Sequence, residues 1–164
     1  VLDREAHVAY AAISERTDPD LFVHFCKEQG FAPIVFHSYQ SVGGKRLPIY
    51  HTNVMMSVGP TFAIIGLQTL DHSEERKKVI EKLEETGKEI IDLTEGQINQ
   101  FAGNMLTLLG DDGPVLVMSS SAYNSLNPEQ VKRLEKHAQM LPSPLTTIEY
   151  CGGGSARCML AELF

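Results

Sequence analysis

Apolar and polar residues alternate along the chain with two different periods. Three stretches have the apolar spacing of amphipathic helices: LFVHFCKEQG, ERKKVIEKLEETG and EQVKRLEKHA. Each follows a helix start signal, since Asp18 and Asn127 both precede a proline and Ser73 precedes two glutamates. The first two stretches end at Gly30 and Gly87, which is typical of helix C-termini. The pattern therefore predicts three helices whose starts are about 54 residues apart.

Short apolar runs before and after each helix predict strands. Those before the helices are HVAYAAIS, TFAIIGL and PVLVMSS, and those after them are APIVFHS, EIIDL and TTIEY. Two further strands, in IYHTNVMMSVG and NMLTLLG, open the second and third units, and CMLAELF ends the chain with the same pattern. A short extra helix is expected in TEGQINQFAG. The alternative to a repeated strand–strand–helix–strand unit is a coincidence among ordinary α/β elements.

A repeat of this length indicates an array of equal units, each unable to bury its apolar face alone. Alignment of the units puts His51, Asn104 and Cys158 at the same point, the start of the first strand. If the units surround a pseudo-rotation axis, these positions face one central space, and we expect His51 and Cys158 to meet. Such a pair is suited to nucleophilic catalysis, because an imidazole favours the thiolate and moves its proton. The alternative is a thiol buried in a strand.

The residues around Cys158 carry weaker signals. Three preceding glycines let the backbone turn sharply and approach a ligand. Arg157 is a candidate to hold a substrate carboxylate, although its neighbouring place on a strand aims it at the opposite face. Asn104 bonds either a polar substrate group, the cysteine loop or backbone groups at a strand start. We expect no metal at Cys151, Cys158 and His51, because this spacing is unlike that of zinc motifs. Cys26 belongs to the core.

Composition limits the function classes. The 164 residues are 43% hydrophobic and carry a net charge of −7, which gives no electrostatic reason to bind nucleic acid or an anionic membrane. Three cysteines without an apolar run near 18 residues predict free thiols in a reducing, cytoplasmic setting. The chain starts at Val1 inside a strand pattern, so we expect it to be a piece of a longer polypeptide.

IYHTN together with GGGSARCM resembles the guanidine-modifying enzymes of the pentein superfamily, which include arginine deiminase, dimethylarginine hydrolase and glycine amidinotransferase. The whole chain is most similar to bacterial arginine deiminase-related hydrolases of citrulline utilisation. The resemblance implies an α/β propeller of five ββαβ units, of which about three are present. Residues 1–164 would then be the C-terminal part of a single pentein domain, without its N-terminal part and without a catalytic carboxylate expected upstream of Val1.

The resemblance also implies a mechanism without a cofactor. Cys158 would attack the carbon of a guanidino or ureido compound and form a covalent thiol adduct, and His51 would act as general acid and base. Asn53 stands where arginine deiminases have an aspartate, which suggests a less cationic substrate such as citrulline. The alternatives are an amidinotransferase or a non-catalytic pentein that binds ribosomes. We expect the chain alone to be nearly inactive, and to associate with a second copy or with the missing N-terminal part.

Overall fold

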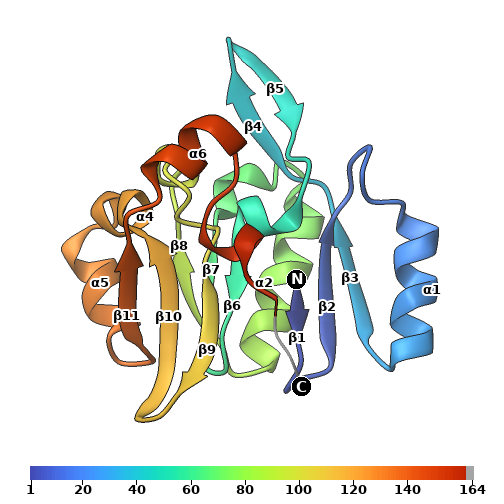
Figure 1. Ribbon diagram of the computed structural model, residues 1–164. Helices are drawn as coiled ribbons and strands as arrows, with labels where there is room; N and C mark the ends of the chain where they lie inside the picture. Colours follow the sequence, from blue (N-terminus) through green and yellow to red (C-terminus); the bar gives the residue numbers. More distant parts are fainter. Residues whose placement is uncertain (162–164) are drawn as a thin grey trace.

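Three sheets of three strands each, with helices between their strands, build the molecule (Figure 1). The computed structural model describes residues 1–161. The first unit contains β1 (Leu2–Asp3), β2 (Val8–Ala12), α1 (Pro19–Gln29) and β3 (Ala32–Phe36). The second contains β6 (Met56–Val58), β7 (Phe62–Ile65), α2 (Ser73–Glu85) and β8 (Glu89–Asp92). The third contains β9 (Leu106–Gly110), β10 (Gly113–Ser119), α4 (Ser120–Ser125), α5 (Pro128–Leu134) and β11 (Gln139–Ser143).

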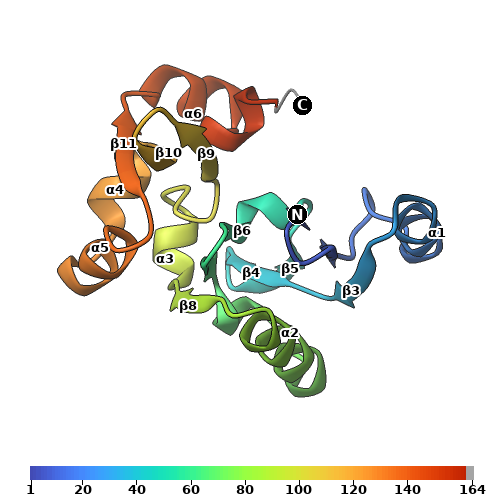
Figure 2. The same ribbon diagram turned by 90° about the horizontal axis from the view of Figure 1, so that it is seen from below.

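All three units have the same topology. The middle strand pairs antiparallel with the first strand of its unit and parallel with the last, in the orders β1-β2-β3, β6-β7-β8 and β11-β10-β9. The parallel pair requires a crossover, which the helices supply. In Figure 2 the helices α1, α2 and α5 lie on the outside, while β6 and β9 lie toward the middle. The predicted strand–strand–helix–strand repeat is confirmed.

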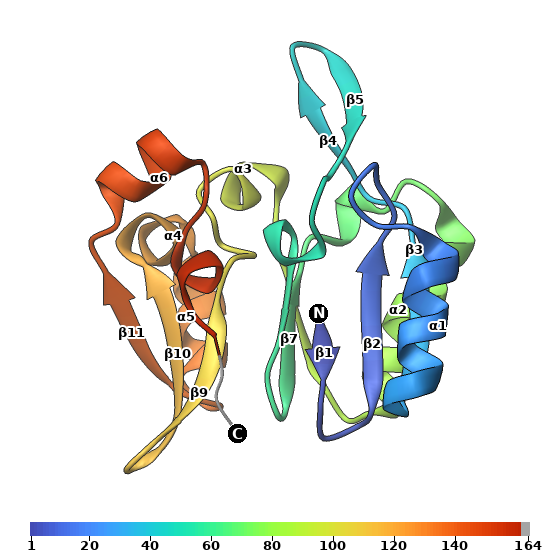
Figure 3. The same cartoon turned by 45° about the vertical axis from the view of Figure 1, so that its right-hand side comes forward.

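The remaining elements connect or follow the units. They are the hairpin β4 (Tyr39–Val42) and β5 (Lys45–Pro48), the short 3-10 helices η1 (Thr52–Val54), η2 (Leu67–Thr69) and η3 (Ala156–Met159), and the helices α3 (Glu95–Ile98) and α6 (Thr146–Gly152). The hairpin stands away from the three sheets in Figures 1 and 3. The predicted short helix after Thr94 is α3, and Thr94 forms a capping box with Gln97.

The predicted helix signals act locally as expected. The Asp18 side chain accepts a hydrogen bond from the Leu21 backbone N–H at 2.8 Å, and Asn127 forms a capping box. Gly30 ends α1 in the left-handed conformation at a φ of 73°. One detail is wrong: Ser73 is the first helical residue of α2 rather than its cap, and the N-cap is His72, which makes no side-chain capping bond.

Two predicted strands are wrong. TTIEY is the start of α6, and the parallel strand of the third unit is instead β11. This strand contains Pro142, and it is tolerated because β11 is an edge strand. Cys158, expected to start a strand, lies in η3, and Leu160 and Ala161 are not in a strand either. The rest of the predicted CMLAELF strand, residues 162–164, lies outside the described residues.

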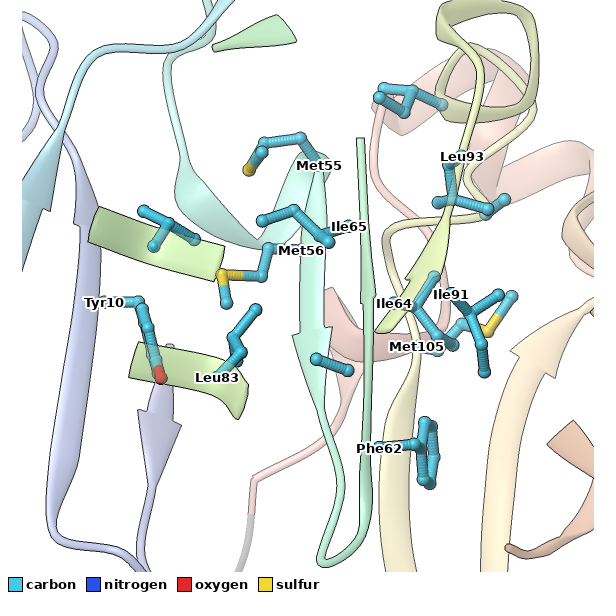
Figure 4. Close-up of a cluster of buried hydrophobic side chains, with 14 of the residues drawn as sticks. Tyr10, Met55, Met56, Phe62, Ile64, Ile65, Leu83, Ile91, Leu93 and Met105 are labelled. Atoms are coloured by element: carbon cyan, nitrogen blue, oxygen red, sulfur yellow. The ribbon is translucent and has the colours of Figure 1, made fainter. Parts of the chain in front are cut away.

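The core lies between the sheets and α2 (Figure 4). Its largest fully buried side chains include Tyr10, Phe36, Phe62, Met55, Met56, Ile64, Ile65, Leu83, Ile91 and Leu93. Cys26 is fully buried on α1, which confirms its predicted place. None of the helices within residues 1–161 combines the length and apolar character that a bilayer crossing requires.

Candidate active site

The glycine-rich segment presents Cys158 at the surface. Gly153 ends α6 at a φ of 65°, and the chain then turns into η3, which carries the cysteine. A Cβ on Gly154 would lie only 3.2 Å from the Cys158 Cβ and 3.4 Å from its Sγ, so this position leaves no free room for a larger side chain. The thiol is exposed. The alternative of a thiol buried in a strand is therefore wrong.

Two asparagine side chains surround the sulfur. The Asn104 Nδ2 lies 3.3 Å from the Cys158 Sγ and also donates to the Asn53 carbonyl oxygen at 3.0 Å. The Asn104 Oδ1 lies 3.5 Å from the same Sγ, and the Asn53 Nδ2 lies 3.9 Å from it. A neutral thiol can therefore donate to the Asn104 oxygen, whereas a thiolate can accept from the amide nitrogens. The amide hydrogens can therefore stabilise negative charge on the sulfur during a nucleophilic reaction.

A close approach between two loops holds Asn104 in place. Gly103 packs against η1 so tightly that a Cβ there would lie 2.3 Å from the Val54 carbonyl oxygen and 2.8 Å from the Met55 Cα. Only glycine permits this contact, which brings the loop before β9 against η1, the segment that contains Asn53. Asn104 itself is buried, with 3% of its surface exposed. Its contacts with the cysteine thus depend on the junction between the second and third units.

His51 lies at the start of the same segment but does not bond to the sulfur. It is the exposed N-cap of η1, and its ring packs edge-on against Tyr50 at a centroid distance of 5.0 Å. Within residues 1–161 its imidazole makes no hydrogen bond. It lies two positions before Asn53, whose amide faces the thiol. The meeting of His51 and Cys158 stays a prediction.

Arg157 lines a cavity between the three units. The cavity has a volume of about 290 Å³ and is also lined by residues of β1, β6 and β9, the first strands of the three units. Cys158 is not among the lining residues. The first strands of the three units thus do face one central space. Arg157 and Cys158 lie in η3 rather than on a strand, so strand alternation does not set their directions, and the role of Arg157 stays a prediction.

A carboxylate behind the cysteine loop was missed by the sequence analysis. Glu149 accepts hydrogen bonds from Ser155 Oγ at 2.6 Å and from Ser121 Oγ at 2.7 Å, and so ties the loop to α4. Burial opposes its ionisation, but hydrogen bonds from Ser119, Ser155 and Ser121 outweigh it, and the pKa of Glu149 lies below its usual value. The apolar pattern of TTIEY predicts a strand, whereas the segment is helical, and this local pattern carries no sign that Glu149 lies behind the cysteine loop.

Comparison with known proteins decides the family. The sequence profile of eukaryotic N,N-dimethylarginine dimethylhydrolases matches residues 1–164. The chain belongs to this family. Membership of the dimethylarginine dimethylhydrolase family confirms the resemblance to guanidine-modifying enzymes. No protein with a curated description matches the chain.

Solved structures similar to this member of the dimethylarginine dimethylhydrolase family include ArgZ, an arginine dihydrolase, and AgrE. ArgZ of the ornithine–ammonia cycle in cyanobacteria superimposes with a TM-score of 0.69 at 16% identity, over 96% of this chain and 23% of that chain. Its N-terminal domain bound to product gives 0.68 at 16% identity, over 96% and 52%. AgrE with L-arginine gives 0.68 at 18% identity, over 96% and 21%. At these identities the likeness shows the shared α/β fold, and the chain spans about half of the ArgZ N-terminal domain.

Proposed function

We propose that this chain carries the nucleophile of a cysteine-dependent hydrolase that cleaves a C–N bond of a guanidino or ureido compound. The observation that carries the proposal is the exposed Cys158 sulfur, held by the Asn104 amide at 3.3 Å in a chain of the dimethylarginine dimethylhydrolase family. A cysteine variant of the ArgZ domain bound to substrate, and another variant of it covalently bound to a reaction intermediate, support the same chemistry for this fold.

The proposed reaction has two halves. The Cys158 thiolate forms an S–C bond to the central carbon, and the C–N bond breaks as His51 gives a proton to the leaving amine. Water then attacks the adduct, His51 takes its proton, and the S–C bond breaks to return the thiolate. From a guanidino substrate the product keeps the water oxygen as its ureido oxygen. From a ureido substrate the amine leaves first, and hydrolysis of the carbamoyl adduct releases a carbamate that decomposes to ammonia and carbon dioxide. The Asn104 amide would stabilise the sulfur anion at the start and end of each cycle.

For the substrate we propose an arginine-type compound. The family description names dimethylarginine, and AgrE binds L-arginine. Asn53 offers the reacting centre an amide 3.9 Å from the sulfur and no charge, which suits a neutral ureido group such as that of citrulline as well as a guanidinium held by acids elsewhere. Asn53, Asn104 and Arg157 are the proposed substrate-binding residues, with Arg157 at the carboxylate end.

We also propose that residues 1–164 are the C-terminal part of one pentein domain, a five-unit propeller in the cytoplasm. The coverage of 52% of the ArgZ domain supports this division. On α1, Leu21, Val23 and Phe25 expose between 43% and 68% of their surface, and such a group of exposed apolar side chains is typical of an interaction surface. The N-terminal part, which would carry the catalytic carboxylate, is the proposed cover; a second copy of the chain is the alternative, which the oligomeric state in solution distinguishes.

Two other functions compete with hydrolysis. In an amidinotransferase an amine replaces the attacking water, and the same thiol and amides would serve. A non-catalytic binding pentein would need no activated thiol, and the amides around the exposed Cys158 favour catalysis over that role.

The test is alkylation with chloroacetamidine, an electrophile shaped like a guanidinium, followed by mass mapping. The chain supplies two internal controls, because Cys151 is exposed and Cys26 is buried. We expect Cys158 to react faster than Cys151, and this advantage to shrink with neutral chloroacetamide and in His51→Ala. Equal rates at the two exposed cysteines, or an advantage that His51→Ala leaves unchanged, would overturn the assignment.

Product analysis with protein that includes the N-terminal part then separates the substrates. Citrulline formed from dimethylarginine or arginine, with dimethylamine or ammonia, indicates hydrolysis of the guanidino group, whereas ornithine formed from citrulline, with ammonia and carbon dioxide, indicates a ureidase. An amidino group transferred to an added amine would favour the amidinotransferase. Turnover by residues 1–164 alone at the rate of the complete protein would refute the expected need for an upstream carboxylate.

A further inference from the structure

Two histidines and a glutamate converge where the first and second units meet. His37 directly follows β3 of the first unit, while His72 and Glu75 come from the start of α2 in the second unit. One ligand atom from each of the three lies within 4.8 Å of the other two. His72 and Glu75 are three positions apart, so they share a helix face. The structure thus brings together three side chains of the types that can bind a metal ion.

The cluster is already partly organised. The His37 Nδ1 lies 3.0 Å and 3.3 Å from the two Glu75 carboxylate oxygens, and the His37 backbone N–H donates to the same carboxylate at 2.6 Å. The rings of His37 and His72 meet edge-on with centroids 5.6 Å apart. The side chains of His37 and Glu75 are 45% and 26% exposed, so an ion from solvent can reach them.

Glu75 is the acidic ligand of the cluster, and both of its carboxylate oxygens already face the His37 ring. The neighbouring cation Arg46 is engaged by Asp71 and Glu95. The Tyr39 hydroxyl lies 3.5 Å from the His72 Nε2 and can hold that ring by its outer nitrogen.

We propose that His37, His72 and Glu75 form a binding site for a divalent metal ion of the zinc type, which clamps the first unit to the second. Two imidazoles and one carboxylate with an open fourth position are a known ligand set for Zn²⁺. Binding distances of about 2.0–2.2 Å need the ligand atoms to draw closer together, and the exposed His72 can rotate to allow it. The ion replaces the contact between His37 Nδ1 and Glu75, and the neutral ring keeps its proton on Nε2.

This site is independent of the proposed catalytic centre. Its three residues make no hydrogen bond with Cys158, Asn104 or Asn53 within the described part of the chain. Because α2 packs against β3 here, an ion that binds both elements stabilises the junction only in the folded state. Zinc should therefore raise the melting temperature, and the rise should grow with the logarithm of the free zinc concentration above the dissociation constant.

The test is calorimetric titration of Zn²⁺ into a Cys151→Ser, Cys158→Ser parent, in which neither exposed thiol can bind the metal. We expect one zinc ion per chain and a zinc-dependent rise in melting temperature. His72→Ala and Glu75→Gln should each weaken binding by at least about tenfold, the lower limit for loss of even an outer-shell partner. His24→Ala, which removes an exposed histidine of α1, is the matched control and should leave the affinity unchanged.

His72 is exposed and makes no capping bond, so His72→Ala is expected to fold normally. The proposal is overturned if zinc binds the parent no more tightly than it binds His72→Ala, or if His24→Ala weakens binding as much. Loss of affinity in His72→Ala but not in Glu75→Gln would refute the three-ligand set. Because the parent has no active thiol, none of these results depends on the proposed hydrolase function.

Discussion

Replacing Gly103 with alanine should separate the two loops that form the thiol site. The new Cβ would lie 2.3 Å from the Val54 carbonyl oxygen, and ordinary contact begins near 3.4 Å, so the backbones must move apart by about 1 Å. The bond from Asn104 Nδ2 to the Asn53 carbonyl, now 3.0 Å, would then stretch to about 4 Å and be lost.

The cost can be estimated from these two effects. Overpacking costs about 1–3 kcal/mol and the lost hydrogen bond about 1 kcal/mol. For a chain of this size each kcal/mol lowers the melting temperature by about 2–4 °C, so we expect a fall on the order of 10 °C. Alkylation of Cys158 should slow toward the rate of Cys151, because Asn104 no longer stabilises the thiolate.

Thermal melting and cysteine mapping check this expectation. Gly96→Ala is the matched control: Gly96 lies inside α3, and a Cβ there meets only the Thr94 Oγ1 at an ordinary 3.7 Å. Alanine in a helix should leave stability unchanged or raise it by up to about 1 kcal/mol. If Gly103→Ala melts like Gly96→Ala and keeps the wild-type reactivity of Cys158, the reasoning about the loop contact is refuted.

Three further substitutions test other parts of the structure. Asn104→Asp puts a negative charge beside the sulfur and repels negative charge on it, so alkylation of Cys158 at a fixed neutral pH should slow; an unchanged rate would contradict the contact. The lowered pKa of Glu149 means that its carboxylate stabilises the fold above the unfolded pKa and that this stability is lost as pH falls through the folded pKa. Urea unfolding should therefore find Glu149→Gln less stable than wild type at neutral pH but equal to it in acid, and a difference independent of pH would speak against this role. The buried Asp3 carboxylate lies 3.0 Å from the Lys88 ammonium, so Lys88→Met leaves it without a cationic partner and should lower the free energy of unfolding by about 3–5 kcal/mol. The double variant with Asp3→Leu should recover most of this stability in thermal or urea unfolding.

Local signals in the sequence were sufficient for most of the fold. Asp18 and Asn127 cap their helices through their own side chains, so the information lies within three residues of each start. The third unit was harder. Its strand β11 contains Pro142, which argues against a strand unless the edge position is known, and its helical region is divided into α4 and α5. Edge position is a property of the assembled sheet and cannot be obtained from a local pattern.

For the site, the repeat was more informative than any single motif. It matched Asn104 with Cys158, and the structure puts their side chains in contact across 54 positions of sequence. It carried no information on Glu149 or on the cluster of His37, His72 and Glu75. These groups meet through packing of elements outside the repeated positions, and charged side chains of this kind are also common on surfaces that bind nothing.

The position of Asn104 links reactivity to assembly. Its side-chain amide donates to the Asn53 carbonyl oxygen, in the connection between the first and second units. The same amide contacts the Cys158 sulfur, which follows the third unit. A nascent or partly unfolded chain therefore contains an ordinary cysteine, and the sulfur gains its amide donors only when both junctions have closed. The selective reaction of Cys158 with a guanidinium-shaped electrophile should therefore appear only once the chain is fully folded.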